Sequence, residues 1–273
     1  MAERRKKKRP NYIWIAVVLV VLVVALVCLL KPGMQKHDLE AAAVAEGRAF
    51  LAELEAKDPG DVRAVREEIY FRRMQAQKDA LTESIMSGET DPFPLFQDYA
   101  ILGDSRAVGF WYHDFLDSDR VLADGGNTIR AIPDRLGQLQ ELNPKYVYLC
   151  YGLNDTSIGY WDTAEAYAAE YMQHVASIQA ILPEAKIVVS SILPARDPAF
   201  NRSGRWRWIP DWNVVLEATC AENGVLYANC NWLYDSFPGS WDPDGIHFRP
   251  SLYPYWGGML LVTALYGGLT YEG

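Results

Sequence analysis

The chain has 273 residues, of which 50% are hydrophobic and 12% aromatic, which is enough for one full domain and an accessory segment. Its formal net charge is −9, and six basic residues lie among the first ten: Arg4, Arg5, Lys6, Lys7, Lys8 and Arg9. Residues 32–273 contain 19 basic and 34 acidic residues, a net charge of −15. Because nucleic acid normally requires a basic protein face, this acidic balance argues against a nucleic-acid partner.

A long apolar segment follows the basic cluster. Residues 12–30 contain neither a charged residue nor proline, and at about 1.5 Å per residue they nearly span a ~30 Å hydrocarbon core. Since the basic flank of such a helix stays in the cytoplasm, we predict a cytoplasmic tail over residues 1–10 and a single membrane-spanning helix over residues 11–30. The rest of the chain would then lie outside the cytoplasm, anchored to the cell membrane. A cleaved signal peptide is the alternative, although its apolar region is normally shorter, about 7–15 residues.

The next segment has the pattern of a helical stem. Residues 37–86 are rich in Ala, Glu, Arg, Lys and Gln, with apolar residues at helical spacing and an interruption at Pro59-Gly60. We predict two helices, with Asp61 as the N-cap of the second; a partly disordered spacer is the alternative. Residues 31–92 are therefore assigned to a stem and linker, and residues 93–273 to the main domain.

The main domain alternates apolar runs of strand length with helical patterns. The predicted strands cover residues 99–102, 121–123, 146–150, 187–190 and 225–228. The predicted helices cover residues 107–116, 128–142, 163–182 and 211–223, and a last one follows Pro250. This alternation predicts a three-layer α/β/α domain around a parallel five-stranded sheet. In such sheets the functional site lies beyond the carboxyl ends of the strands.

Four short motifs follow the predicted strands, the first three directly and the last after a longer loop. They are Gly103-Asp104-Ser105, Gly125-Gly126-Asn127-Thr128, Gly152-Leu153-Asn154-Asp155 and Asp244-Gly245-Ile246-His247. Each alone has an ordinary interpretation, such as a helix N-cap serine, a turn glycine pair or a loop cap. Because all four are expected at one edge of the sheet, we interpret them together.

Together these motifs supply the groups that acyl transfer through an activated serine requires. Ser105 can act as the nucleophile at the start of a helix, with His247 as its base and Asp244 orienting the imidazole. The backbone N–H groups of Ser105 and Gly126 and the side-chain amide of Asn154 can form an oxyanion hole. No cofactor is predicted.

On these four motifs the chain resembles the SGNH hydrolases, the GDSL-like esterase superfamily, over roughly residues 98–268. The resemblance implies a flavodoxin-like SGNH fold, and it implies the catalytic and oxyanion roles given above for Ser105, Asp244, His247, Gly126 and Asn154. The neighbouring Gly125 leaves the register of the second motif open by one residue. Two departures from the family pattern concern specificity more than chemistry: Arg106 replaces an aliphatic residue, and Phe248 stands where proline is common.

The segment 201–212 breaks the α/β pattern and concentrates three tryptophans and three arginines. Tryptophan faces can stack on sugar rings and arginines can hold anionic groups, which would suit an acylated cell-envelope glycan. The candidate substrate contacts are Arg106, Trp206, Trp208 and Trp241. A hydrophobic lid or ordinary core packing is the alternative.

We therefore expect a membrane-anchored extracytoplasmic serine esterase that removes O-acyl groups, most simply O-acetyl, from envelope carbohydrate. Transfer of the acyl group to a sugar hydroxyl uses the same residues and stays open, as does hydrolysis of lipid esters. The alternative from another class is a non-catalytic surface binding module. The sequence does not indicate the oligomeric state.

The remaining candidate ligands are cysteine and histidine. Cys28 lies inside the apolar segment, so Cys150, Cys220 and Cys230 remain, an odd number that cannot all pair. Cys220 and Cys230 could form a disulfide, but we favour three separate buried thiols in a chain of this size. The four histidines show no metal-ligand spacing, so no metal is predicted.

Overall fold

The computed structural model describes residues 41, 44–53 and 62–268. The predicted tail over residues 1–10, the membrane helix over residues 11–30 and the Asp61 cap lie outside the described residues. Within the described residues, no helix combines the length and apolarity needed to cross a bilayer. The contacts divide the chain into two units, residues 1–67 and 68–273.

Two stretches of the predicted stem are helical. Residues 44–53 form a helix, and α2 covers Val62–Met86. Near its C-terminal end, α2 packs on the main domain, because Ile85 is fully buried against Gly258. This end of α2 therefore belongs structurally to the same unit as the sheet.

A parallel five-stranded sheet forms the centre of the main domain, as predicted. Its strands are β1 (Tyr99–Gly103), β2 (Val121–Ala123), β3 (Tyr146–Cys150), β4 (Lys186–Ser190) and β5 (Leu226–Ala228). Their order in the sheet is β2-β1-β3-β4-β5, and all neighbours are parallel. In this order β2 lies on one side of β1, and β3 lies on the other side. Ligands of doubly wound sheets bind where the strand order reverses in this way, at the carboxyl ends of the two strands, here β1 and β3.

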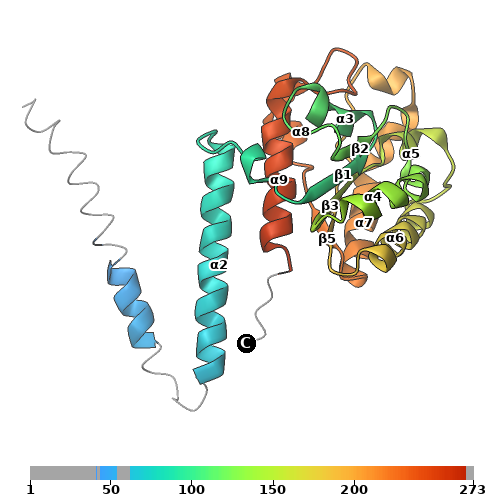
Figure 1. Cartoon of the computed structure of the whole chain (residues 1–273). Coiled ribbons are helices and arrows are strands. Elements are labelled where there is room, and N and C mark those ends of the chain that lie inside the picture. The colour runs from blue at the N-terminus through green and yellow to red at the C-terminus, as the bar shows by residue number, and fades with distance from the viewer. Residues whose placement is uncertain (1–40, 42–43, 54–61, 269–273) are drawn as a thin grey trace, which may run out of the picture. The chain divides into compact units, whose positions relative to one another are not determined.

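Helices cover both faces of the sheet (Figure 1). The α-helices of the main domain are α3 (Ser105–Tyr112), α4 (Leu136–Leu142), α5 (Leu153–Ile158), α6 (Ala164–Ile181), α7 (Ile209–Glu222), α8 (Leu233–Ser236) and α9 (Tyr253–Tyr266). Short 3-10 turns are η2 (Phe93–Leu95), η3 (Ile129–Ala131), η4 (Pro133–Arg135), η5 (Ala199–Asn201), η6 (Gly204–Trp208), η7 (Pro238–Ser240) and η8 (Pro250–Leu252).

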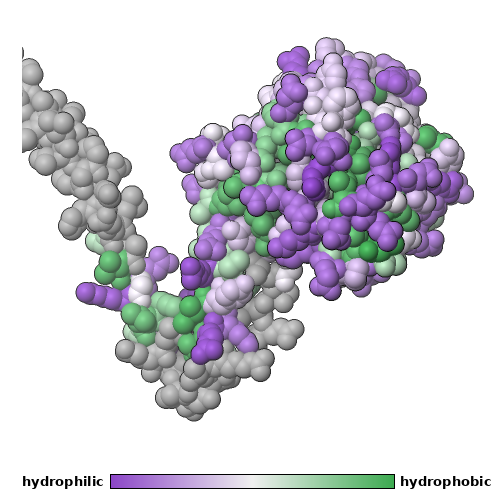
Figure 2. Space-filling model, in the orientation of Figure 1, coloured by the Kyte–Doolittle hydropathy of each residue, from purple (hydrophilic) through white to green (hydrophobic). Residues whose placement is uncertain are grey.

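The strands divide their side chains between two cores, because successive residues of a strand point to opposite faces. Leu102 and Leu149 pack with α4, α6 and α7 on one face, whereas Ile101 and Tyr148 pack with α3 and α9 on the other. Both faces are buried, which explains why the strands are continuous apolar runs. The surface seen in Figure 2 is correspondingly mostly hydrophilic over the main domain, with smaller hydrophobic areas between.

The structure contradicts one helix prediction and confirms the prediction of separate buried thiols. The segment predicted as a helix over residues 128–142 is instead two 3-10 turns followed by α4. Pro133 lacks the N–H that a continuous helix would need there, so the helix begins only after it. Cys150, Cys220 and Cys230 are unpaired and buried, as favoured from the sequence.

Candidate active site

Ser105 lies at the turn that joins β1 to α3. A Cβ atom on Gly103 would lie 2.5 Å from Ala107 Cβ and 2.6 Å from Cys150 O, so the turn can pass only with glycine here. Asp104 caps the helix, since its Oδ1 accepts a hydrogen bond from Arg106 N at 2.9 Å. Ser105 therefore occupies the first residue of α3, where free backbone N–H groups favour negative charge.

His247 contacts both other members of the predicted serine–histidine–aspartate set. Its Nε2 lies 3.0 Å from Ser105 Oγ, and its Nδ1 lies 2.6 Å from Asp244 Oδ2. The other carboxylate oxygen of Asp244 accepts hydrogen bonds from the backbone N–H groups of Ile246 at 2.8 Å and His247 at 3.0 Å. An ionised Asp244 thus holds the proton on Nδ1 and leaves Nε2 free to accept the serine proton.

The environment of Asp244 keeps this carboxylate ionised. Partial burial opposes ionisation, but the two backbone N–H groups and the His247 ring outweigh it and lower the pKa of Asp244 below its ordinary value. The side chains of His247 and Asp244 are 43% and 35% exposed, so the pair is open to a substrate. The ionised Asp244 can therefore orient the imidazole of His247.

The two predicted oxyanion motifs are joined to each other and to the serine turn. Asn154 Nδ2 donates to Asn127 O at 2.9 Å, and Asn127 Nδ2 donates to Gly103 O at 3.5 Å. Gly126 has a φ of +82°, and nothing lies within 4 Å of the position of a Cβ atom, so the loop borders open space there. One hydrogen of the Asn154 amide is donated to Asn127 O, and none of the described hydrogen bonds uses the second.

Asp155 is a site residue for which the sequence suggested no role. It is fully buried, and its Oδ1 accepts a hydrogen bond from Ile129 N at 2.9 Å, which ties α5 to the end of the Gly126–Thr128 loop. Burial raises the pKa of Asp155 to about 7. Its position directly after Asn154 was the available signal, since a carboxylate in a buried turn needs backbone donors.

The burial of Arg106 contradicts its predicted contact with substrate. The side chain is only 3% exposed, and its guanidinium donates to Ile246 O at 2.8 Å, to Pro194 O at 3.4 Å and to Leu193 O. Burial lowers the pKa of Arg106 to about 10, so the group stays charged at neutral pH. Because its donors are engaged by two loops, Arg106 positions the candidate site instead of binding substrate.

The three candidate tryptophans differ in how much of each side chain is exposed to a ligand. Trp241 is 5% exposed and donates to Pro194 O at 3.2 Å, so its predicted role in substrate contact is wrong: the indole is a packing residue. Trp206 is 6% exposed and donates to Leu153 O at 2.7 Å, yet one part of it lines a cavity. Trp208 is 45% exposed, with Arg205 stacked over its ring at 4.9 Å.

A further loop that the sequence did not single out holds the histidine loop. Residues 191–198 follow β4, and Arg196 N donates to Gly245 O at 2.8 Å. Its place after a strand at the same sheet edge was the only sequence signal. Among the described residues, no group of three His, Cys, Asp or Glu side chains is arranged to hold a metal ion.

A three-layer α/β/α domain with these four motifs at the carboxyl edge of its sheet has the architecture of the SGNH hydrolases. A family model for the GDSL-like lipase/acylhydrolase family matches residues 83–253, more than half of the chain. The chain belongs to this family, whose members are ester hydrolases.

Solved structures support the fold assignment. A protein designated a GDSL-like lipase from Parabacteroides merdae is 16% identical, with a TM-score of 0.51 over 63% of this chain and 95% of that chain. An acylhydrolase-type protein from Bacteroides fragilis is 20% identical, with a TM-score of 0.51 over 63% of this chain and 88% of that one. None of the curated proteins compared with this chain matches it significantly. At these identities the likeness concerns the fold.

Proposed function

We propose that this protein is a membrane-tethered, extracytoplasmic serine esterase that removes O-acyl groups, specifically acetyl, from cell-envelope carbohydrate. One observation carries the chemistry. His247 Nε2 lies 3.0 Å from Ser105 Oγ, and His247 Nδ1 lies 2.6 Å from Asp244 Oδ2. This is the geometry in which a base can take the serine proton while a carboxylate fixes its tautomer.

In the first half of the reaction, Ser105 Oγ attacks the carbonyl carbon of the ester and His247 Nε2 takes the hydroxyl proton. The negative charge that develops on the carbonyl oxygen is stabilised by the backbone N–H groups of Ser105 and Gly126 and by the Asn154 amide. When the tetrahedral intermediate collapses, the bond to the sugar oxygen breaks and His247 returns the proton to that oxygen. The acyl group is left on Ser105.

In the second half, water takes the place of the sugar hydroxyl. His247 removes a proton from the water as the water attacks the acyl carbonyl, and the proton passes to Ser105 Oγ as the acid leaves. Transfer to a sugar acceptor would use the same steps with a hydroxyl in place of water. Asp244 stays ionised throughout and stabilises the imidazolium.

Three observations support the substrate class and location. The apolar segment over residues 12–30, with basic residues before it, favours a tether that leaves the catalytic domain outside the cytoplasm. The segment 201–212 concentrates tryptophan and arginine after β4, at the edge of the sheet that holds the candidate site. Exposed Trp208 offers an aromatic face of the kind that stacks on sugar rings.

The test is hydrolysis of p-nitrophenyl acetate by the full-length protein in detergent, beside Ser105→Ala and a matched Ser177→Ala on α6. The wild type and Ser177→Ala should turn over at equal rates, whereas Ser105→Ala should lose activity at least about 10³-fold and remain folded. Turnover by Ser105→Ala at the wild-type rate would refute the assignment of the nucleophile.

The same preparation distinguishes hydrolysis from transfer. Adding a sugar acceptor to the p-nitrophenyl acetate reaction should leave the acetate yield equal to the p-nitrophenol yield if water is the acceptor. A shortfall of acetate, matched by acetylated sugar, would reassign the protein as an acyltransferase with the same nucleophile.

A further inference from the structure

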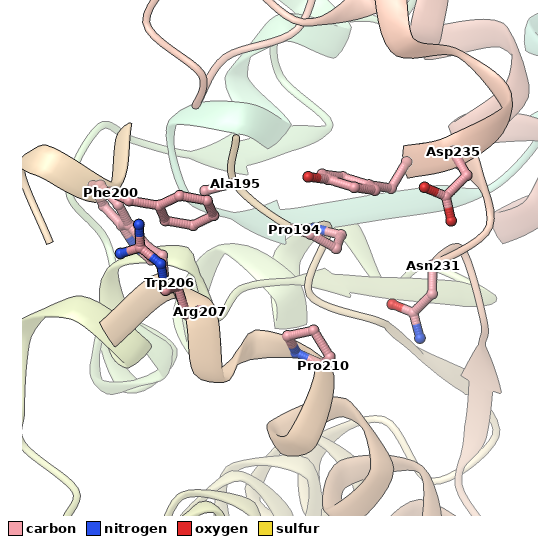
Figure 3. A pocket seen from close by; sticks show the side chains of 9 residues that line it. Pro194, Ala195, Phe200, Trp206, Arg207, Pro210, Asn231 and Asp235 are labelled. Carbon is pink, nitrogen blue, oxygen red and sulfur yellow. The ribbon is translucent and has the colours of Figure 1, made fainter. Parts of the chain in front are cut away.

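A cavity of about 440 Å³ lies between the loop after β4 and the segment 200–210, and it has no part in the mechanism proposed above. Its volume falls within the range of small-molecule sites, roughly 300–1,000 Å³. Phe200, Trp206 and Arg207 form one side of it, and Asn231 and Asp235 form the other (Figure 3).

Two walls of this cavity are bonded to neighbours of the reacting groups. Trp206 Nε1 donates to the carbonyl of Leu153, which directly precedes the candidate oxyanion side chain. Pro194 also lines the cavity, and its carbonyl accepts a hydrogen bond from Arg106, which directly follows the candidate nucleophile. The cavity is therefore bonded to both the loop that carries Asn154 and the turn that carries Ser105.

The polar side of the cavity is held in place by buried hydrogen bonds. Asn231 Oδ1 accepts a hydrogen bond from Asn213 Nδ2 at 2.7 Å, and Asn213 is itself buried and bonded to the backbone of Ile192. This fixes the amide of Asn231, and none of the described contacts uses its Nδ2 donor. With the exposed carboxylate of Asp235, the cavity offers a donor and an acceptor side by side, which match adjacent hydroxyl groups.

The opposite side is mainly aromatic, with one guanidinium. Phe200 and Trp206 present aromatic rings, and Arg207 stacks over Phe200 at 4.2 Å. A sugar ring has an apolar C–H face for such a surface and hydroxyls for the polar side. A hydrocarbon chain would instead remove Asn231 and Asp235 from water without hydrogen-bond partners, which is unfavourable.

We propose that this cavity is a subsite for an uncharged glycosyl unit adjacent to the one that bears the ester. The proposal rests on the esterase function proposed above and deepens it: the preferred substrate is an acylated oligosaccharide or polymer, not an acylated monosaccharide. The site would supply affinity through units that do not react.

The experiment compares substrates that differ only in the neighbouring sugars. The full-length protein in detergent is assayed for kcat/KM on O-acetylated tetramers of N-acetylglucosamine, glucose and xylose, on the corresponding monomers and on p-nitrophenyl acetate. At least one tetramer should exceed its monomer about tenfold. Asn231→Ala and Asp235→Ala should each lower the ratio of tetramer to p-nitrophenyl acetate activity roughly five- to tenfold, the effect of one lost hydrogen bond.

The matched control is Asp134→Ala, an exposed carboxylate on η4, which should leave that ratio at the wild-type value. Equal kcat/KM for every tetramer and its monomer would overturn the subsite. The subsite would also be overturned if Asn231→Ala and Asp235→Ala lowered hydrolysis of p-nitrophenyl octanoate and left the tetramer ratio unchanged, because that result indicates a pocket for an acyl chain. Binding of the unacetylated tetramers to Ser105→Ala, measured by tryptophan fluorescence, separates the two proposals. Binding without any serine-dependent hydrolysis would sink the esterase function but not the sugar site.

Discussion

Replacing Arg106 with methionine should destabilise the domain strongly, although the side chain is not one of the reacting groups. The guanidinium donates to three backbone carbonyls, those of Ile246, Leu193 and Pro194, from a buried position. Methionine fills much of the same volume but donates no hydrogen bond. The substitution therefore removes the donor to the carbonyls of Ile246 and Leu193, whereas the carbonyl of Pro194 keeps its hydrogen bond from Trp241 Nε1.

The magnitude follows from the cost of buried acceptors. Each buried polar group left unpaired costs about 1–3 kcal/mol, so the two carbonyls of Ile246 and Leu193 cost about 2–6 kcal/mol. Part of this is offset because a buried charge and its desolvation penalty are removed. We expect Arg106→Met to lower the free energy of unfolding by about 2–4 kcal/mol, a substantial part of the 5–15 kcal/mol typical of a folded domain.

Urea unfolding of the full-length protein in detergent, followed by tryptophan fluorescence, measures this change through the midpoint and the slope. Arg202→Met is the control, because Arg202 is exposed, and it should change stability by less than about 0.5 kcal/mol. A loss below about 1 kcal/mol for Arg106→Met, with an unchanged slope, would refute the argument that this guanidinium holds the two loops together.

Three further predictions concern the neighbouring loops. Asn154→Ala should lower kcat for p-nitrophenyl acetate by about 10²- to 10³-fold with a smaller change in KM, and a change below tenfold would remove Asn154 from the oxyanion hole. Asp155 ionises near 3.8 in the unfolded chain and at about 7 when buried, so its contribution to stability is lost as the pH rises through that window. Between about pH 4 and pH 8, wild type should lose up to about 4 kcal/mol relative to Asp155→Asn in urea unfolding, and parallel pH profiles would contradict this. Gly152→Ala should cost at least about 2 kcal/mol by the same assay, because Gly152 has a φ of +125° and a Cβ atom would lie 2.3 Å from Ile192; an unaltered midpoint would exclude that clash.

The features of the fold that follow from periodicity could be predicted from the sequence. The apolar runs gave all five strands, because a strand buried on both faces needs no polar residue along its length. Helix boundaries were less accurate: the helix predicted from residue 107 begins at Ser105, where the Asp104 side chain caps it. The Arg106 side chain was predicted to contact substrate because it follows Ser105 at a position where the family pattern has an aliphatic residue. Instead it is buried, and backbone carbonyls compensate its burial.

The contacts that hold the candidate site together share a property that explains why the sequence did not reveal them. Asn154 donates to Asn127 O, Asp155 accepts from Ile129 N, and Arg106 donates to Ile246 O. In each pair one partner is a backbone group, which every residue carries, so the pair leaves a signature at only one of its two positions. A sequence therefore shows which side chains can react, because reaction needs particular functional groups. The alignment of these side chains depends on backbone groups brought close by the folded sheet, so substitutions at Arg106 and Asp155 test that alignment without touching a reacting atom.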